Sequence, residues 1–320
     1  MRLSFYCVLE VGIEDPDEPK DPETPHFIPA YSQKVKASKE FQTFQFDHSF
    51  VLNSLKSSME GYVFHNQPLD TDDLLEQTVK LFNSCKTSLE LFDMLHNMRA
   101  YDDSTYAHSL NVALICRRIG KWLKVDAATL DTLTLCGLLH DIGKLKIPDE
   151  ILNKPGKYTD EEFDLVKRHT KFGYELLKTL NIDPHIKKAA LLHHERCDGS
   201  GYPLKATQKD LDDFSMVVAI ADVYDAMTAA RSYRAPLCPF QVIERFEQEG
   251  LQKYKPKFIL TFLQHIASTY QNNRVLLSNG QSANIVMLNQ QHLARPIVQL
   301  NDNSCIDLST RLDLHIQSIL

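Results

Sequence analysis

A histidine followed directly by an aspartate, His140-Asp141, ends an apolar run at 136–139. Imidazole and carboxylate groups are both ligands for divalent transition metals, and the two oxygens of one carboxylate can bridge two ions. Gly143 allows a close backbone approach, and Lys144 brings a cation to the same place. An isolated His-Asp pair is more often a hydrogen-bonded contact in a core, so its significance depends on the rest of the chain.

Five more candidate ligands lie elsewhere in the chain, each in a different predicted helix or at a helix end. They are His108, His169, His193, His194 and Asp222. A helical bundle that projects ligands inward from several helices forms a polynuclear metal site. Five imidazoles and two carboxylates without cysteine favour Fe, Mn, Ni or Zn over Ca and Mg, which prefer oxygen ligands. Seven ligands exceed the need of one tetrahedral ion and suit two ions that share a carboxylate.

The elements that carry these residues are predicted to be helices. From Thr71 onward apolar residues recur at helical spacing, and Thr71-Asp72-Asp73 offers capping side chains for the first helix. The predicted helices span 71–99, 103–123, 126–143, 159–180, 183–196, 208–231, 238–250 and 256–271. Turn residues at 154–156 and 198–201 separate several of them. We therefore expect an all-helical domain over residues 71–273.

The N-terminal region, residues 1–70, has a different character. We expect 1–13 to form one strand or a short helix. Residues 14–29 contain six acidic residues and five prolines, which predict a solvated linker or loop because proline removes backbone donors. Residues 30–70 have no clear pattern, and their role stays open. Four phenylalanines there are available to pack on a neighbour: Phe41, Phe44, Phe46 and Phe50.

The last stretch, residues 274–320, is predicted to form a small β appendage. Asn279-Gly280 lies between the apolar runs 275–277 and 285–288, which is a strong hairpin signal. A second hairpin is expected from 295–300 and 305–308. We interpret this appendage as a packing module or a homodimer contact without chemistry of its own.

Length, charge and cysteine usage narrow the class of protein. The chain has 320 residues, which favours about two domains, and a net charge of −7, which argues against DNA or an anionic membrane as the main partner. No apolar run approaches the ~18 residues of a membrane span. Residues 1–13 lack a signal-peptide cleavage pattern. The seven scattered cysteines form no CxxC pair, which predicts reduced thiols and a cytoplasmic protein.

The stretches around the candidate ligands resemble the HD-GYP family of the HD phosphohydrolase superfamily. The matching motifs are HDIGK at 140–144, the series from Ile147 to Lys157, EEF at 161–163 with Lys167 and His169, HHERCDGSGYP at 193–203, and ADVYDAMT at 221–228 with Arg231 and Arg234. The resemblance covers about residues 100–270, and the ordered series is far more specific than a lone HD pair.

The resemblance implies a mainly α fold, a helical HD-superfamily bundle here joined to the β appendage and a mixed N-terminal region. It also implies two or three metal ions, often Fe or Mn. By the family pattern, one ion is held by His108, His140, Asp141 and Asp222, and the other by Asp141, His169, His193 and His194. Members with three metals carry a glutamate one helical turn before the first histidine. Ser104 stands there in this chain, which favours two ions.

The implied activity is hydrolysis of cyclic di-GMP to pGpG and in some members onward to GMP. Asp141 and Lys144 are the expected catalytic residues, and Lys144 matches the family's phosphate contact. Arg231 and Arg234 match a basic element near the substrate, and Tyr202 stacks or hydrogen-bonds at the rim or faces a partner protein. In the expected mechanism a hydroxide that bridges the two ions attacks phosphorus, while the ions and Lys144 neutralise the growing charge.

Three acidic residues near the ligands, Glu195, Asp198 and Asp225, are expected to orient the imidazoles. Two alternatives to cyclic di-GMP hydrolysis remain open. One is a phosphodiesterase that prefers mixed cyclic GMP-AMP. The other is a non-catalytic module that binds a dinucleotide or a diguanylate cyclase. The complete set of seven ligands favours catalysis over the second alternative.

Overall fold

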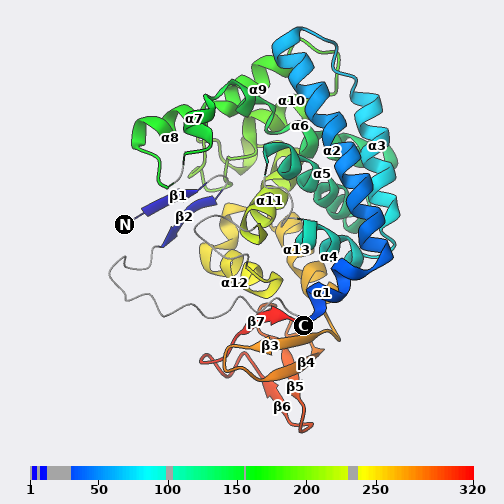
Figure 1. Cartoon of the computed structure of the whole chain (residues 1–320). Coiled ribbons are helices and arrows are strands. Elements are labelled where there is room, and N and C mark those ends of the chain that lie inside the picture. Colours follow the sequence, from blue (N-terminus) through cyan, green and yellow to red (C-terminus); the bar gives the residue numbers. More distant parts are fainter. Residues whose placement is uncertain (1, 6–7, 13–29, 99–103, 155, 230–236) are drawn as a thin grey trace.

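The computed structural model describes residues 2–5, 8–12, 30–98, 104–154, 156–229 and 237–320 (Figure 1). Its helices are α1 (Ala30–Ala37), α2 (Lys39–His65), α3 (Thr71–Ser84), α4 (Ser88–Met98), α5 (Thr105–Trp122), α6 (Ala127–Leu139), α7 (Asp149–Leu152), α8 (Asp160–Lys167), α9 (His169–Leu177), α10 (Pro184–Leu192), α11 (Asp213–Thr228), α12 (Pro239–Glu249) and α13 (Pro256–Thr269). Short 3-10 helices are η1 (Ile142–Lys146), η2 (Gln208–Asp210) and η3 (Leu251–Lys253). The strands are β1 (Arg2–Phe5), β2 (Val8–Gly12), β3 (Arg274–Leu277), β4 (Ser282–Met287), β5 (Ile297–Leu300), β6 (Cys305–Asp307) and β7 (Ile316–Ile319). The mainly α class with a C-terminal sheet is confirmed.

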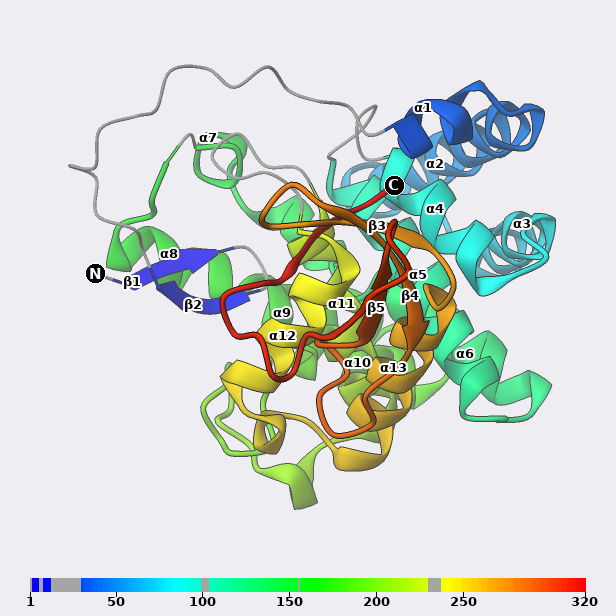
Figure 2. The ribbon, with the colours of Figure 1, turned by 90° about the horizontal axis from the view of Figure 1, so that it is seen from below.

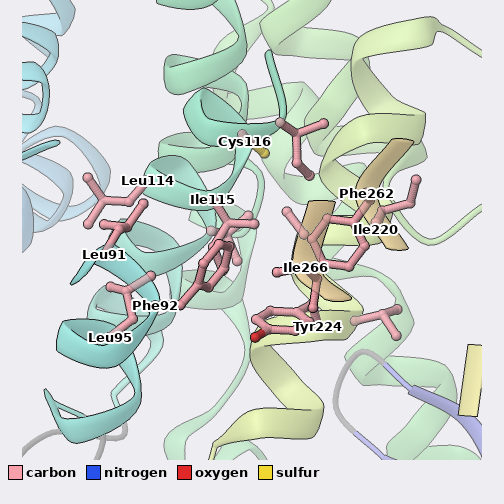
Figure 3. Packing of buried hydrophobic residues seen from close by; sticks show 14 of the residues in the cluster. Leu91, Phe92, Leu95, Leu114, Ile115, Cys116, Ile220, Tyr224, Phe262 and Ile266 are labelled. Atoms are coloured by element: carbon pink, nitrogen blue, oxygen red, sulfur yellow. The ribbon is translucent and has the colours of Figure 1, made fainter. Parts of the chain in front are cut away.

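Helices α5 and α11 form the centre of the bundle and are buried along most of their length. A helix that is apolar on nearly all sides must be surrounded by others, and here α6, α10 and α13 pack around this pair. Figure 3 shows part of this core, where Phe92 of α4 and Phe262 of α13 each meet Tyr224 of α11 edge to face. The central helices therefore offer a rigid support for side chains at their ends.

The N-terminal region contributes two helices to the same core. Ser38 caps α2 by accepting from the N–H of Phe41, and both Phe41 and Phe44 are buried on its inner face. Phe46 and Phe50 lie on the outer face and are 74% and 62% exposed. Residues 2–5 and 8–12 form two short antiparallel strands, so the expectation of a single strand or a short helix was wrong. A domain boundary near residue 70 stays a prediction.

The predicted helix over 71–99 is two helices, α3 and α4. Asp70 caps α3 by accepting from the N–H of Asp73, so the cap precedes the expected Thr71. The chain becomes extended at Cys85, which ends α3. Thr87 then accepts from the N–H of Glu90 and starts α4. A side-chain cap inside an apolar periodic run explains the break, because it satisfies N–H groups that a continuous helix would bond to carbonyls.

Three further predicted helices end earlier than expected, and each ends beside a candidate ligand. Helix α6 stops at Leu139, the predicted helix 159–180 divides at Arg168 into α8 and α9, and α10 stops at Leu192. The predicted helix 208–231 likewise starts only at Asp213, after the 3-10 turn η2. None of the described helices is both long and apolar enough to cross a bilayer.

The C-terminal residues form one antiparallel sheet with strand order β6-β5-β4-β3-β7. Both predicted hairpins are present, while β7 was not predicted. The sheet lies at one end of the bundle beside α12 and α13, as Figure 1 and Figure 2 show. Arg295 donates to Glu244 of α12 at 2.7 Å, and the Cys238 thiol lies 3.4 Å from the carbonyl of Ile316. These contacts fix the sheet on the first turns of α12.

Candidate metal centre

The candidate centre begins where α6 ends. The Nδ1 atom of His140 donates to the carbonyl of Gly137 at 2.7 Å, which leaves the lone pair of its Nε2 facing inward. Asp141 has φ −102° and ψ 9°, outside the helical region. Ending the helix here lets two adjacent residues, which would point about 100° apart on a continuous helix, turn toward one centre. His140 and Asp141 are both fully buried.

The two oxygens of Asp141 face two different groups of histidines. Its Oδ2 lies 3.2 Å from Nε2 of His140 and 3.6 Å from Nε2 of His108. Its Oδ1 lies 3.4 Å from Nε2 of His169 and 3.6 Å from Nε2 of His193. This is the arrangement that a bridging carboxylate requires.

The histidines of the second group are held by backbone carbonyls. Nδ1 of His169 donates to the carbonyl of Val166 at 2.6 Å, and Nδ1 of His193 donates to that of Ala189 at 2.9 Å. A carbonyl only accepts, so each ring carries its proton on Nδ1 and presents the lone pair of its Nε2 inward, where the two Nε2 atoms lie 3.3 Å apart. Burial lowers the pKa of His169 to about 3 and lowers the pKa values of His193 and His194. These three imidazoles are therefore neutral near pH 7, as metal ligands must be.

The first group is completed by α5 and α11. Nε2 of His108 lies 2.9 Å from Oδ1 of Asp222, and Nδ1 of His108 lies 2.8 Å from Oδ2 of Asp225, one turn further along α11. Asp225 thus contacts an imidazole, as expected. Because it accepts at Nδ1, it orients the ring so that Nε2 faces Asp222 and Asp141.

We expect Asp225→Asn to lower metal affinity by about 10–100-fold, because the amide pairs more weakly with His108 and loosens its ring. Metal titration of the stripped protein measures this directly. Asp213→Asn, an exposed site on the same helix, is the matched control and should leave the affinity unchanged. Equal affinities in the two variants would show that Asp225 does not set the position of His108.

Lys144 belongs to the buried centre. It is 4% exposed, and its Nζ lies 2.5 Å from Oδ2 of Asp141. Burial alone would raise the pKa of Asp141, but the adjacent His140 ring and the Lys144 ammonium outweigh it and hold that pKa well below its usual range. The Asp141 carboxylate is therefore ionised and able to bind a cation.

Two glycines of the motifs are required by close backbone approaches. A Cβ on Gly143 would lie 2.0 Å from the carbonyl oxygen of His169, so only glycine lets η1 pack on α9. A Cβ on Gly201 would lie 2.5 Å from the carbonyl oxygen of His194. At both glycines the chain packs closely on the backbone of a candidate ligand, His169 or His194, which explains the glycines in HDIGK and in GYP.

Glu195 and Asp198 have partners other than the expected imidazoles. Glu195 accepts from the N–H groups of Leu204 at 2.5 Å and Ala206 at 3.0 Å. Asp198 accepts from the N–H and hydroxyl of Ser200. The expectation that they orient histidines was wrong. The chain reverses after His194, and both carboxylates accept instead from loop N–H groups that lack backbone partners.

Tyr202 lies at the edge of the centre. Its ring centre is 4.7 Å from that of His194, with 30° between the ring planes, and its N–H donates to the carbonyl of His194 at 3.3 Å. Ser104 occupies the position where the resemblance expects a glutamate in three-metal members. Here it caps α5 by accepting from the N–H of Ala107. Arg231 and Arg234 lie outside the described residues.

The residues fit the binding of divalent metal. Asp141, His169, His193 and His194 each offer a ligand atom within 4.8 Å of the others, as do His108, His140 and Asp222. Three buried atoms that face this centre have no hydrogen-bond partner: Nε2 of His140, Oδ1 of Asp141 and Oδ2 of Asp222. Unpaired buried polar atoms are costly, and metal bound at the centre would satisfy these three.

Comparison with known proteins agrees with this geometry. A family model described as HD domain matches residues 73–258. A 3'3'-cGAMP-specific phosphodiesterase 2 of Vibrio cholerae is 34% identical over 183 residues, which cover 56% of this chain and 35% of that protein. A cyclic di-GMP phosphodiesterase of Thermotoga maritima is 35% identical over 178 residues, which cover 55% of this chain and 48% of that protein. The matched part is at most about half of either relative.

Among solved structures, a protein of Bdellovibrio bacteriovorus described as HDG"Y"P aligns with a TM-score of 0.50 and 18% identity, covering 74% of this chain and 78% of that one. At this identity the alignment shows the shared fold alone. The chain belongs to the HD domain family. Within it, the GYP loop and the names of the relatives support the HD-GYP family.

Proposed function

We propose that this chain is a metal-dependent phosphodiesterase that hydrolyses a cyclic dinucleotide, cyclic di-GMP, to pGpG, with a second cleavage to GMP left open. The observation that carries the proposal is the position of Asp141, whose two oxygens face two complete groups of buried ligands. The relatives named as phosphodiesterases for cyclic di-GMP and cyclic GMP-AMP support this substrate class.

His108, His140, Asp141 and Asp222 would hold one ion, and Asp141, His169, His193 and His194 the other. Iron or manganese is our first proposal for both, with nickel or zinc as alternatives, since neutral imidazoles and carboxylates suit all four. When bound, such ions act as Lewis acids on a phosphoryl oxygen and lower the pKa of water. The protein's own part is to keep the imidazoles neutral, the carboxylates ionised and the ligands in place.

Lys144 would bind a phosphoryl oxygen of the substrate. Its ammonium is held at the centre by Asp141, and a cation next to Asp141 would compete with it for that carboxylate. The freed ammonium then has donors for an anionic oxygen. Arg231, Arg234 and Tyr202 are proposed as further substrate contacts.

We expect Lys144→Met to raise KM for cyclic di-GMP about tenfold or more while metal content stays the same, because one charge-assisted hydrogen bond to phosphate is lost. Steady-state kinetics and elemental analysis on the same preparation measure both quantities. Loss of metal in this variant would contradict a phosphate role and make Lys144 a support for Asp141.

Two alternatives are kept as outcomes of the test. One is a preference for mixed cyclic GMP-AMP, which the Vibrio cholerae relative's name favours. The other is a non-catalytic receptor that binds a dinucleotide or a diguanylate cyclase.

The cytoplasmic location, the homodimer and the three-part division at residues 70 and 273 also stay predictions. The six described cysteines are all free, which supports a reducing compartment.

The test is to purify the chain without oxygen, measure its metals, and follow cyclic di-GMP and cyclic GMP-AMP side by side by product chromatography. We expect close to two metal ions per chain and linear products from cyclic di-GMP. Faster turnover of cyclic GMP-AMP would make that dinucleotide the preferred substrate in place of cyclic di-GMP. Binding without any product from either dinucleotide, with both metals present, would establish the receptor alternative instead.

A further inference from the structure

A row of aromatic rings leads from the candidate metal centre to α8. The Tyr202 ring packs on His194 at 4.7 Å, and the Phe163 ring of α8 meets Tyr202 edge to face at 6.2 Å and 79°. Tyr202 and Phe163 are both partly exposed. The row therefore begins on a candidate ligand inside the protein and ends at the surface.

A lysine lies at the outer end of this row. Lys167 is one helical turn after Phe163, and its Nζ lies 4.8 Å from the centre of the Phe163 ring. It also forms an ion pair with Asp164, and its side chain is 30% exposed. These two contacts restrict where the ammonium lies, while its three N–H donors leave capacity for another acceptor.

Helix α8 is fixed relative to the centre at both ends. Thr159 and Glu162 form a capping box at its start, and Lys154 donates to Glu162. At its end, Val166 is buried and its carbonyl accepts from Nδ1 of His169. The Phe163 and Lys167 side chains thus stand at a defined place beside the ligands.

Resting on the proposed function, we propose that α8 forms the base-binding wall of the substrate site. One nucleobase of the cyclic dinucleotide packs against Tyr202 and Phe163, since aromatic rings stack on any base. Lys167 donates to that base. Guanine presents two neighbouring acceptors, O6 and N7, whereas adenine presents a donor beside N7. Lys167 therefore selects guanine over adenine at this position.

The experiment compares Phe163→Ala and Lys167→Met with Lys171→Met, a control at an exposed lysine one turn further on. Three substrates are used: cyclic di-GMP, cyclic di-AMP and methyl 4-nitrophenyl phosphate, a phosphodiester without a base. We expect both test variants to raise KM for cyclic di-GMP about tenfold, with kcat, metal content and turnover of the baseless diester within about twofold. Lys167→Met should also reduce the preference for cyclic di-GMP over cyclic di-AMP about tenfold. The control should change none of these.

Unchanged KM in both variants, beside normal wild-type turnover, would overturn this inference and leave the proposed function intact. If the variants lost as much activity on the baseless diester as on cyclic di-GMP, the inference would also be overturned, because α8 would then act only by supporting His169. Lys167→Met keeps the test decisive if Phe163→Ala fails to fold. A wild-type protein that cleaves none of the three substrates would overturn the proposed function and this inference together.

Discussion

Replacing both His140 and Asp141 by alanine should abolish cyclic dinucleotide turnover, lowering kcat/KM by about 10⁴-fold or more. The two substitutions remove one ligand of the first group and the carboxylate whose oxygens face both groups. Asp222 also faces both sets of histidines, with Oδ1 2.9 Å from Nε2 of His108 and Oδ2 3.8 Å from Nδ1 of His194. Each proposed ion would nevertheless lose at least one of its ligands. Product chromatography with added Mn or Fe measures turnover, and elemental analysis should show loss of bound metal.

This double variant leaves the buried Lys144 ammonium without the Asp141 carboxylate, and breaking a buried ion pair by removing one partner costs about 3–5 kcal/mol. A triple variant that adds Lys144→Met removes that charge and separates loss of chemistry from loss of folding. His315→Ala, at an exposed histidine, is the matched control. Undiminished turnover in a folded double or triple variant would refute the metal-ligand assignment.

Gly143→Ala should destabilise the protein and the centre together. The added methyl would lie 2.0 Å from the His169 carbonyl oxygen and 2.4 Å from the backbone nitrogen of Gly173, both in α9. Backbone atoms cannot rotate away, so η1 and α9 must separate, at a cost of about 3 kcal/mol or more. We expect the thermal midpoint to fall by roughly 5–10 °C and metal affinity to weaken, because η1 follows Asp141 and α9 begins with His169.

Gly280→Ala is the control for this prediction. Gly280 has φ +83° and nothing near its Cβ position, so the substitution carries only the backbone cost of about 1–2 kcal/mol. Calorimetric melting of both variants, with and without metal, separates the two effects. A Gly143→Ala protein that melts like Gly280→Ala and binds metal normally would show that the contact between η1 and α9 is not needed.

The sequence predicted which residues would meet at the candidate centre, and the reason is chemical. His108, His169 and Asp222 are polar residues inside apolar periodic helices, where burial is costly without a partner. The seven candidates do meet in the described structure, although their metal binding stays a proposal. Asp225 was also proposed from the sequence, and in the structure it contacts Nδ1 of His108.

Helix ends could not be obtained from apolar spacing. The run across 126–143 stays apolar through the point where α6 stops, so periodicity does not reveal the change to η1. The partners of Glu195 were missed for a similar reason. An acidic residue beside two histidines indicates a ligand support, but a chain reversal brought the N–H groups of Leu204 and Ala206 closer. Such contacts depend on tertiary packing, which single-sequence patterns do not contain.

Two of the ligand-bearing helices, α6 and α10, finish at the candidate centre, where His140 and His193 are their C-terminal caps. The aligned peptide dipoles of a helix place about half a negative charge at that end. The main chain thus adds to the negative potential of Asp141 and Asp222 before any imidazole is counted. A cation should therefore retain weak affinity for this place even in a variant whose two carboxylates are replaced by amides.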